Sequence, residues 1–321
     1  PHILAEPQRT NLITYSEDFS DSSWTKLGGG TGTTAVVTSD YAISPDGTQN
    51  ASRLQCDLNG GGSSLSNQSL IYDLYSSSGD QALSIYLKSN NGSNQTIYFA
   101  NTQTSGDTIT VTNEWQRFTF IHSTTNYVFA VGLRGRSGGA IDDTADVLIW
   151  GAQVEVGSYP TSLIPTSGST VTRNQDIFTR DGIGSLINST EGVLFVEMAA
   201  LSNDTSSIII SINDGSLSNS VAIYYYSNVN NVASNIFNGG SNPSLIGTIP
   251  NSGTRYDFNK IALKYKSGDS ALWINGIEVF TLGDSISLTG LNKISFDYGN
   301  GSFPFYGKVK QLQVYDTALT D

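Results

Sequence analysis

Few residues in this sequence belong to the types that form a nucleophilic or zinc-dependent catalytic centre. The chain has two histidines, His2 and His122, and one cysteine, Cys56. Ser137 lies in a Gly-x-Ser-x-Gly pattern, but hydrolases with that pattern carry their histidine after the serine. Both histidines precede Ser137, and two distant histidines with one cysteine cannot form a His-Glu-x-x-His or multi-thiolate zinc site. The sequence therefore excludes serine hydrolysis of this kind, a Cys–His nucleophile pair and those two kinds of zinc site.

Three glutamates are candidates for glycoside hydrolysis, which needs two carboxyl groups a few ångströms apart. Glu155, Glu197 and Glu278 each lie singly on or beside an expected strand, and the chain contains no Glu-x-Asp-x-Glu run. Isolated carboxylates on strands are more often surface or edge residues than catalytic pairs. We therefore expect a protein that is not an enzyme, and we retain polysaccharide hydrolysis as the last of three hypotheses.

Three aspartates, Asp142, Asp143 and Asp146, fall within one expected loop beside glycines. Carboxylate and carbonyl oxygens are the ligands that Ca²⁺ takes in proteins. The spacing does not match the Asp-x-Asp-x-Asp-Gly pattern of a calcium-binding loop, so an exposed acidic turn is the favoured interpretation. A structural calcium ion remains the alternative, and these three residues are its candidate ligands.

The polar phase of the first group of strands offers aromatic and basic side chains on one expected sheet face. Its candidates for carbohydrate binding are Tyr86, Lys88, Tyr98, Arg117 and Arg134. An aromatic ring stacks on the apolar C–H face of a sugar, and cationic or amide side chains bond its hydroxyl groups. Tyrosine also loses little conformational entropy on binding. The alternative is that these tyrosines only cover the outer surface of a sheet, because tyrosine is common in strands.

Two tyrosines in the second half of the chain are further candidates. In the run Tyr224-Tyr225-Tyr226, alternation along a strand directs Tyr225 to one face and its two neighbours to the other. At least one ring must therefore face solvent. This makes Tyr224 and Tyr226 candidate carbohydrate-binding residues, with coverage of a sheet edge as the alternative.

Short strands must position all of these residues. A two-residue period is clearest in residues 81–88, where Leu83, Ile85 and Leu87 alternate with more polar side chains. Further strands are expected at 95–100, 115–122, 127–134, 147–156, 192–199, 206–212, 220–226, 260–266, 271–274, 277–282, 293–296 and 307–315. Asn275-Gly276 predicts a two-residue hairpin turn between two of them. Such runs, separated by turns, are typical of a β-sandwich or barrel.

Length and charge limit the classes of protein that fit. The chain has 321 residues, enough for two domains, and a formal net charge of −12 with only 16 Lys and Arg. So few basic residues argue against nucleic-acid binding, and no apolar run approaches the ~20 residues of a membrane-spanning helix. Residues 160–176 hold two prolines and no periodicity. We expect an all-β protein with two tandem antiparallel β-sandwiches, residues 1–159 and 177–321, joined by an extended linker at 160–176.

Several segments resemble known modules. One group is similar to a jelly-roll carbohydrate-binding module of tailed-bacteriophage virion proteins: Pro1–Phe19, Ser44–Leu54 and Trp150–Asp176. A second group looks like the concanavalin-A-like, laminin-G-like lectin sandwich: Thr190–Ala199, Leu272–Val279 and Phe305–Asp321. The resemblance implies a jelly roll followed by a concanavalin-A-like domain.

The same resemblance implies a location on the virion surface and a homo-oligomer, for which a trimer is expected. Its first functional reading is a non-catalytic, fibre-like or receptor-binding protein that attaches to bacterial surface polysaccharide and contacts other virion proteins. The second is a structural decoration or fibre protein whose partners are mainly proteins. The third is a capsule depolymerase that uses Glu197 or Glu278.

Overall fold

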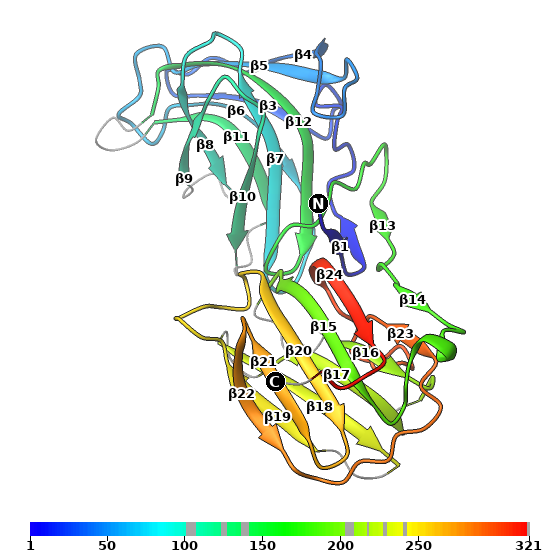
Figure 1. Ribbon diagram of the computed structural model, residues 1–321. Helices are drawn as coiled ribbons and strands as arrows, with labels where there is room; N and C mark the ends of the chain where they lie inside the picture. Colours follow the sequence, from blue (N-terminus) through cyan, green and yellow to red (C-terminus); the bar gives the residue numbers. More distant parts are fainter. Residues whose placement is uncertain are drawn as a thin grey trace. The chain divides into compact units, whose positions relative to one another are not determined.

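The computed structural model describes residues 1–100, 107–122, 127–135, 141–202, 209–216, 218–226, 230–239 and 243–319. Its regular structure is almost entirely strands, and the helical content of this part is one 3-10 turn, η1 (Gly184–Leu186) (Figure 1). Within the same ranges no helix has the length and apolar character needed to cross a membrane. Every ladder between named strands is antiparallel, which confirms the expected all-β sandwich class.

Residues 8–174 form the first compact unit, which we call the N-terminal sandwich. One of its sheets contains, in spatial order, β10 (Gln116–His122), β7 (Gln81–Ser89), β12 (Thr144–Val156), β5 (Ala51–Asp57) and β4 (Val36–Ala42). The other contains β3 (Thr25–Gly29), β6 (Gln68–Leu74), β11 (Val128–Arg134), β8 (Gln95–Ala100) and β9 (Asp107–Val111). A short ribbon joins β2 (Arg9–Asn11) to β13 (Val171–Arg173).

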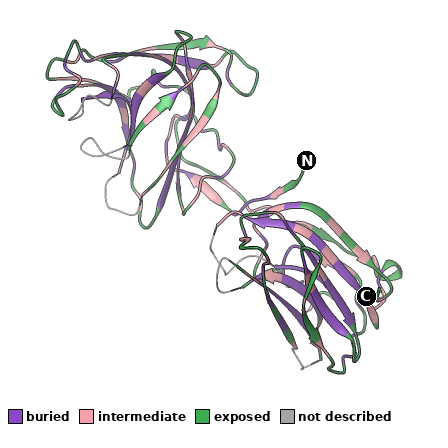
Figure 2. Cartoon of the chain, turned by 60° about the vertical axis from the view of Figure 1, so that its left-hand side comes forward, coloured by how far each residue is buried: buried purple, intermediate pink, exposed green. Residues whose placement is uncertain are grey.

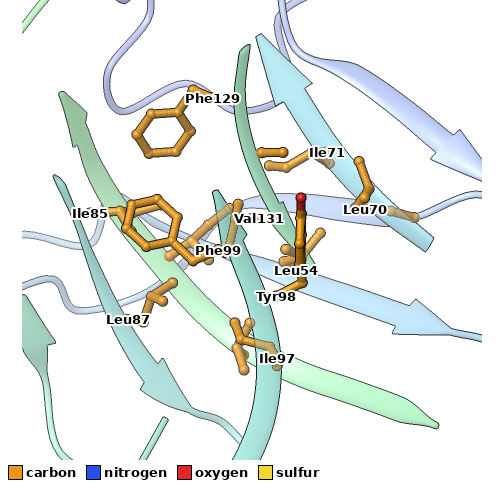
Figure 3. Close-up of a cluster of buried hydrophobic side chains, with 14 of the residues drawn as sticks. Leu54, Leu70, Ile71, Ile85, Leu87, Ile97, Tyr98, Phe99, Phe129 and Val131 are labelled. Atoms are coloured by element: carbon orange, nitrogen blue, oxygen red, sulfur yellow. The ribbon is translucent and has the colours of Figure 1, made fainter. Parts of the chain in front are cut away.

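The core of this unit follows the predicted alternation. Leu83, Ile85 and Leu87 on β7 are fully buried, together with Phe129 and Val131 on β11. Figure 3 shows part of this cluster, in which both sheets contribute side chains. Burial of apolar surface at roughly 25 cal/mol per Å² makes this core the main stabilising contribution in the unit.

Residues 1–7 and 175–321 form the second unit, the C-terminal sandwich. Its first sheet contains β1 (Ile3–Ala5), β24 (Gly307–Tyr315), β15 (Glu191–Ala200), β20 (Asn259–Lys266), β21 (Ser270–Ile274) and β22 (Ile277–Leu282). Its second contains β14 (Thr179–Arg180), β23 (Lys293–Ser295), β16 (Ile209–Asn213), β17 (Asn219–Tyr225), β18 (Asn231–Asn238) and β19 (Ser244–Thr248). The buried segments of these strands appear purple in Figure 2.

The predicted hairpin turn joins β21 to β22. Asn275 and Gly276 both have positive φ, 52° and 83°. Those values suit Asn and Gly, and they give the type of turn whose twist matches that of the flanking strands. The Asn275 side chain also accepts a 2.9 Å hydrogen bond from the Lys260 backbone N–H, which ties the turn to β20.

The boundaries of the units differ from those expected from the sequence. β1 belongs to the C-terminal sandwich, because Ile3 to Ala5 pair with β24. Residues 160–174 belong to the N-terminal sandwich and do not form a free linker. There, the Asn11 side chain donates to the Ile164 carbonyl at 2.9 Å, and Glu155 accepts from the Thr161 backbone N–H at 2.8 Å. Polar side chains from earlier strands thus hold this proline-containing segment in place.

Candidate functional site

Three of the predicted residues on the N-terminal sandwich share one outer sheet face. In the strand register Arg117 lies opposite Tyr86, and Tyr86 lies opposite Trp150 on β12. The Arg117 guanidinium carbon is 5.5 Å from the Tyr86 ring centroid, and the Tyr86 and Trp150 rings are 5.3 Å apart. Lys88 is two residues beyond Tyr86 and therefore on the same face. We call Tyr86, Lys88, Arg117 and Trp150 the basic face.

Tyr98 and Arg134 do not join that face, contrary to the expectation. They lie on β8 and β11, which belong to the other sheet. Tyr98 is fully buried within the hydrophobic cluster, as Figure 3 shows, and Arg134 is 7 % exposed. Ala130, on the same phase of β11, is also fully buried. This sheet is buried on both sides at these positions, so alternation there no longer separates core from solvent.

The three candidate calcium ligands serve different partners. Asp142 accepts from the Thr96 backbone N–H at 2.7 Å, and Asp143 accepts from the Gly60 N–H at 2.8 Å. Asp146 forms a two-pronged ion pair with Arg53 at 2.8 and 2.6 Å, which lowers the pKa of its carboxyl group. Across the described ranges, no cluster of three His, Cys, Asp or Glu side chains is arranged to hold a metal ion. The carboxylates act instead as hydrogen-bond acceptors for the loop and the sheet.

The three glutamates are also placed apart by the fold. Glu155 is fully buried and accepts from the Gln153 side chain at 2.7 Å as well as from Thr161. Glu197 on β15 pairs with Lys310 at 3.4 Å, while Glu278 on β22 is exposed. β20 and β21 separate β15 from β22, a spacing of roughly 14 Å. That exceeds the ~5–9.5 Å between the carboxyl groups of a glycosidase.

The outer face of the second sheet of the C-terminal sandwich carries a cluster of aromatic rings. Tyr225 is fully buried, whereas Tyr226 is 41 % exposed and Tyr224 is half-buried, as alternation predicts. The cluster, which we call the aromatic face, consists of Tyr224, Tyr226, Phe237, Tyr298 and Phe303. Neighbouring rings meet edge-on at centroid distances of 5.6 to 6.2 Å. Edge-to-face pairs of this kind are favourable contacts and fix the orientation of each ring.

A buried amide connects two of these rings. The Tyr224 hydroxyl donates to Asn235 Oδ1 at 2.9 Å, and Asn235 Nδ2 donates to the Tyr298 hydroxyl at 3.2 Å. Burial raises the pKa of both tyrosines, in the case of Tyr298 to about 12. Both hydroxyl groups are therefore protonated at neutral pH, and Tyr298 can still donate its own proton outward because it accepts from Asn235.

The loop between β23 and β24 brings Tyr298 and Phe303 onto this face. The Ser211 hydroxyl donates to the Asp297 carbonyl at 2.6 Å, and Lys293 donates to the Gly299 carbonyl at 3.2 Å. A Cβ on Gly299 would come within 2.4 Å of the Asn213 side chain, so only glycine allows the loop to approach the sheet this closely. Sequence reasoning missed Tyr298 and Phe303 because no local period relates a loop to a strand far from it in the chain. It missed Phe237 because it did not predict β18, the strand that carries this residue.

A separate hollow of about 620 Å³ lies at one edge of the C-terminal sandwich. Its walls are mostly apolar and come from the first residues of the chain, from residues 177–180 and from β23 and β24. Ile3 and Ile177 are 45 % and 70 % exposed beside it. Such a surface suits an apolar partner better than a sugar, which needs hydrogen-bonding groups around an aromatic platform.

No protein-family model matches the sequence, and no curated protein matches it significantly. Among solved structures, the chain is similar to the CBM40 module of the Ruminococcus gnavus IT-sialidase, with 20 % sequence identity and a TM-score of 0.36. The alignment covers 45 % of this chain and 94 % of the module. The CBM22 tandem of Paenibacillus barcinonensis Xyn10C aligns with 14 % identity and a TM-score of 0.31, over 98 % of this chain and 100 % of the tandem. Mouse laminin α1 domains LG4-5 align with 11 % identity, 79 % and 89 % coverage and a TM-score of 0.32.

These neighbours are carbohydrate-binding modules and a laminin G pair. At these identities and scores they do not assign the chain to a family. The β-sandwich fold rests on the sheets described above.

Proposed function

We propose that this protein is a non-catalytic attachment protein of a bacteriophage virion surface that binds bacterial surface polysaccharide. The aromatic face is the observation that carries the glycan-binding part of this proposal. Its rings are held in fixed orientations, and Tyr226 and Phe303 are 41 % and 50 % exposed. A sugar can stack its apolar face on such rings at a low entropic cost.

Hydrogen-bonding groups between the rings supply the second requirement for a sugar. Asn235 fixes the hydroxyl groups of Tyr224 and Tyr298, and the Tyr298 proton is available to a sugar hydroxyl. A platform that is already in its binding conformation loses little further freedom when a ligand arrives. The aromatic face thus combines apolar surface with positioned polar groups.

The non-catalytic part of the proposal rests on the placement of the candidate carboxylates. Glu155 is buried against Thr161, and Glu197 is separated from Glu278 by two strands. The virion location and the homo-oligomer rest on the resemblance of the sequence to phage modules. Repeated copies would convert weak single-site affinity into firm attachment through avidity.

Titration of the intact chain against bacterial surface polysaccharides, after screening on a glycan array, tests this function. We expect Tyr224→Ala and Phe303→Ala each to weaken binding about tenfold, because loss of a stacked ring costs about 1–1.5 kcal/mol. Tyr315→Ala is the matched control, since Tyr315 is an exposed tyrosine on the other sheet of the same unit. A folded protein that binds no glycan, or equal effects of all three substitutions, would refute the proposal.

The apolar hollow supports a second candidate, a structural virion protein whose main partners are proteins. Exposed apolar side chains such as Ile177 mark protein interfaces more often than sugar sites. Under this alternative, Ile177→Asp abolishes assembly with virion proteins and leaves glycan titrations unchanged. Sedimentation of the intact chain with isolated virion components distinguishes the two functions.

A further inference from the structure

The basic face of the N-terminal sandwich carries positive charge without a matching carboxylate. Among the described residues, neither Lys88 nor Arg117 forms an ion pair. Arg53, which lies across Leu148 from Lys88 in the same row of the sheet, is already paired with Asp146. Arg117 lies over the Tyr86 ring, and Lys88 follows Tyr86 by two residues on the same face, so two cations without a carboxylate partner flank this part of the sheet.

The same face contains buried hydrogen-bond donors that lack an acceptor. Trp150 is 6 % exposed, and its Nε1–H has no partner in the described part of the chain. Arg117 Nε is also buried and unsatisfied, although its Nη2 donates to the Ser84 hydroxyl at 2.9 Å. Buried polar groups in native proteins are nearly always bonded, and an unsatisfied cluster indicates a missing water, ion or ligand. Here every unsatisfied group is a donor.

From these observations, and resting on the proposed glycan-binding function, we propose that the basic face binds a carboxylate-bearing sugar of an anionic polysaccharide. The sugar ring lies on Tyr86, and its carboxylate lies between Lys88 and Arg117. Tyr86 and Arg117 are directly paired across adjacent strands, and Lys88 lies about 7 Å along the same face. This spacing suits an acidic sugar, whose charge is attached directly to the pyranose ring.

The geometry favours a carboxylate over a phosphate. Guanidinium groups pair with both anions. In a phosphodiester-linked polymer, an ester oxygen lies between the sugar ring and the phosphorus, so the charge is farther from a ring stacked on Tyr86 than the charge of a carboxylate is. The net negative charge of the chain also opposes long-range attraction of polyanions, so binding depends on these short-range contacts.

Calorimetric titration of the intact protein with polygalacturonate, alginate and colominic acid tests the proposal. Fully methyl-esterified polygalacturonate is the neutral control, because it keeps the sugar ring and loses the charge. Polyphosphate is the control for general anion binding. We expect at least one carboxylate polymer to bind at least tenfold more tightly than both controls, and its affinity to fall several-fold between 50 and 300 mM salt.

Variants then identify the residues involved. We expect Lys88→Gln and Arg117→Gln each to weaken binding of that polymer about tenfold. Tyr86→Ala should weaken binding of the polymer more than either of these substitutions does, whereas Tyr86→Phe, which keeps the ring, should leave the affinity unchanged. Lys260→Gln, at an exposed lysine of the other unit, is the matched control. Within the described part of the chain, the Lys88 side chain forms no hydrogen bond or ion pair, so its substitution tests the site even if the Arg117 variant folds poorly.

Several outcomes overturn this inference: no binding of any of the three carboxylate polymers, equal binding of polyphosphate, or unchanged affinity of Lys88→Gln. Its failure is distinguishable from failure of the proposed function. Neutral glycan binding that is lost in Tyr224→Ala and unaffected by Lys88→Gln leaves the aromatic face intact and removes only the acidic-sugar site. Acidic glycan binding that depends on Lys88 and is insensitive to Tyr224→Ala supports the acidic-sugar site and removes the aromatic face as the glycan-binding site.

Discussion

At the scale of single residues, Asn235 decides whether the aromatic face is preorganised. Its amide is 5 % exposed and holds the hydroxyl groups of two tyrosines on different elements. We expect Asn235→Ala to lower the free energy of unfolding by about 1–2 kcal/mol, because two half-buried hydroxyl groups lose a partner. Glycan affinity should fall several-fold as the rings gain freedom.

Asn231→Ala provides the comparison for this prediction. Asn231 lies on the same strand, and among the described residues its side chain accepts a single long hydrogen bond, 3.4 Å from the Thr248 hydroxyl. Urea unfolding of both variants measures the contribution of each asparagine to stability, and calorimetric titration measures its contribution to glycan affinity. Equal glycan affinities of Asn235→Ala and the unsubstituted chain would show that the hydrogen bonds of Asn235 to Tyr224 and Tyr298 do not contribute to binding.

A second residue-scale feature is the buried carboxyl group of Asp73 on β6. Burial, with a smaller contribution from the charge of Asp21, raises the pKa of Asp73 to about 6. The folded state therefore holds a proton that the unfolded state has already lost above about pH 4. Stability should fall as pH rises from about 4 to about 6, by of order 2 kcal/mol.

Asp73→Asn should remove this component, because an amide does not titrate. The measurement is the midpoint of urea unfolding of both proteins between pH 4 and pH 7. If the unfolding midpoints of the two proteins change with pH in the same way, the pH dependence of stability comes from groups other than Asp73.

At the scale of elements, the β21–β22 hairpin depends on one backbone conformation. A Cβ on Gly276 would meet no atom within 4 Å, so φ of 83° is the sole obstacle to a side chain there. Gly276→Ala should therefore cost about 1–2 kcal/mol of stability. Gly283 also has open space around its Cβ position but no positive φ, and Gly283→Ala should cost less than 0.5 kcal/mol. Thermal melts of the two variants make the comparison, and equal losses would contradict it.

At the scale of the whole molecule, the structure relocates the boundaries of the sandwiches. A chain cut after residue 159 loses the Thr161 donors to the buried Glu155 carboxylate and the β2–β13 ribbon. We therefore expect a fragment of residues 1–159 to be at least 3 kcal/mol less stable than one of residues 8–174. Urea unfolding of the two fragments tests this, and equal midpoints would restore the boundary expected from the sequence.

How much could be predicted differs between the fold and the site. The alternation at Leu83, Ile85 and Leu87 and the Asn275-Gly276 turn are local signals, and the structure confirms both. Alternation also placed Tyr86, Lys88 and Arg117 on one face. It was wrong for Tyr98 and Arg134, because a two-residue period does not reveal a sheet that is buried on both sides.

The sequence by itself determined what depends on neighbouring residues: many of the strands from residue 81 onward, the hairpin turn and the scarcity of histidine, cysteine and basic side chains. The tertiary structure decided what depends on contacts between distant segments. It separated the candidate carboxylates, moved β1 and residues 160–174 to other units, and brought Tyr298 and Phe303 onto the sheet of Tyr224. Backbone conformation is set by local sterics, whereas a binding surface forms only when loops and strands far apart in the chain come together.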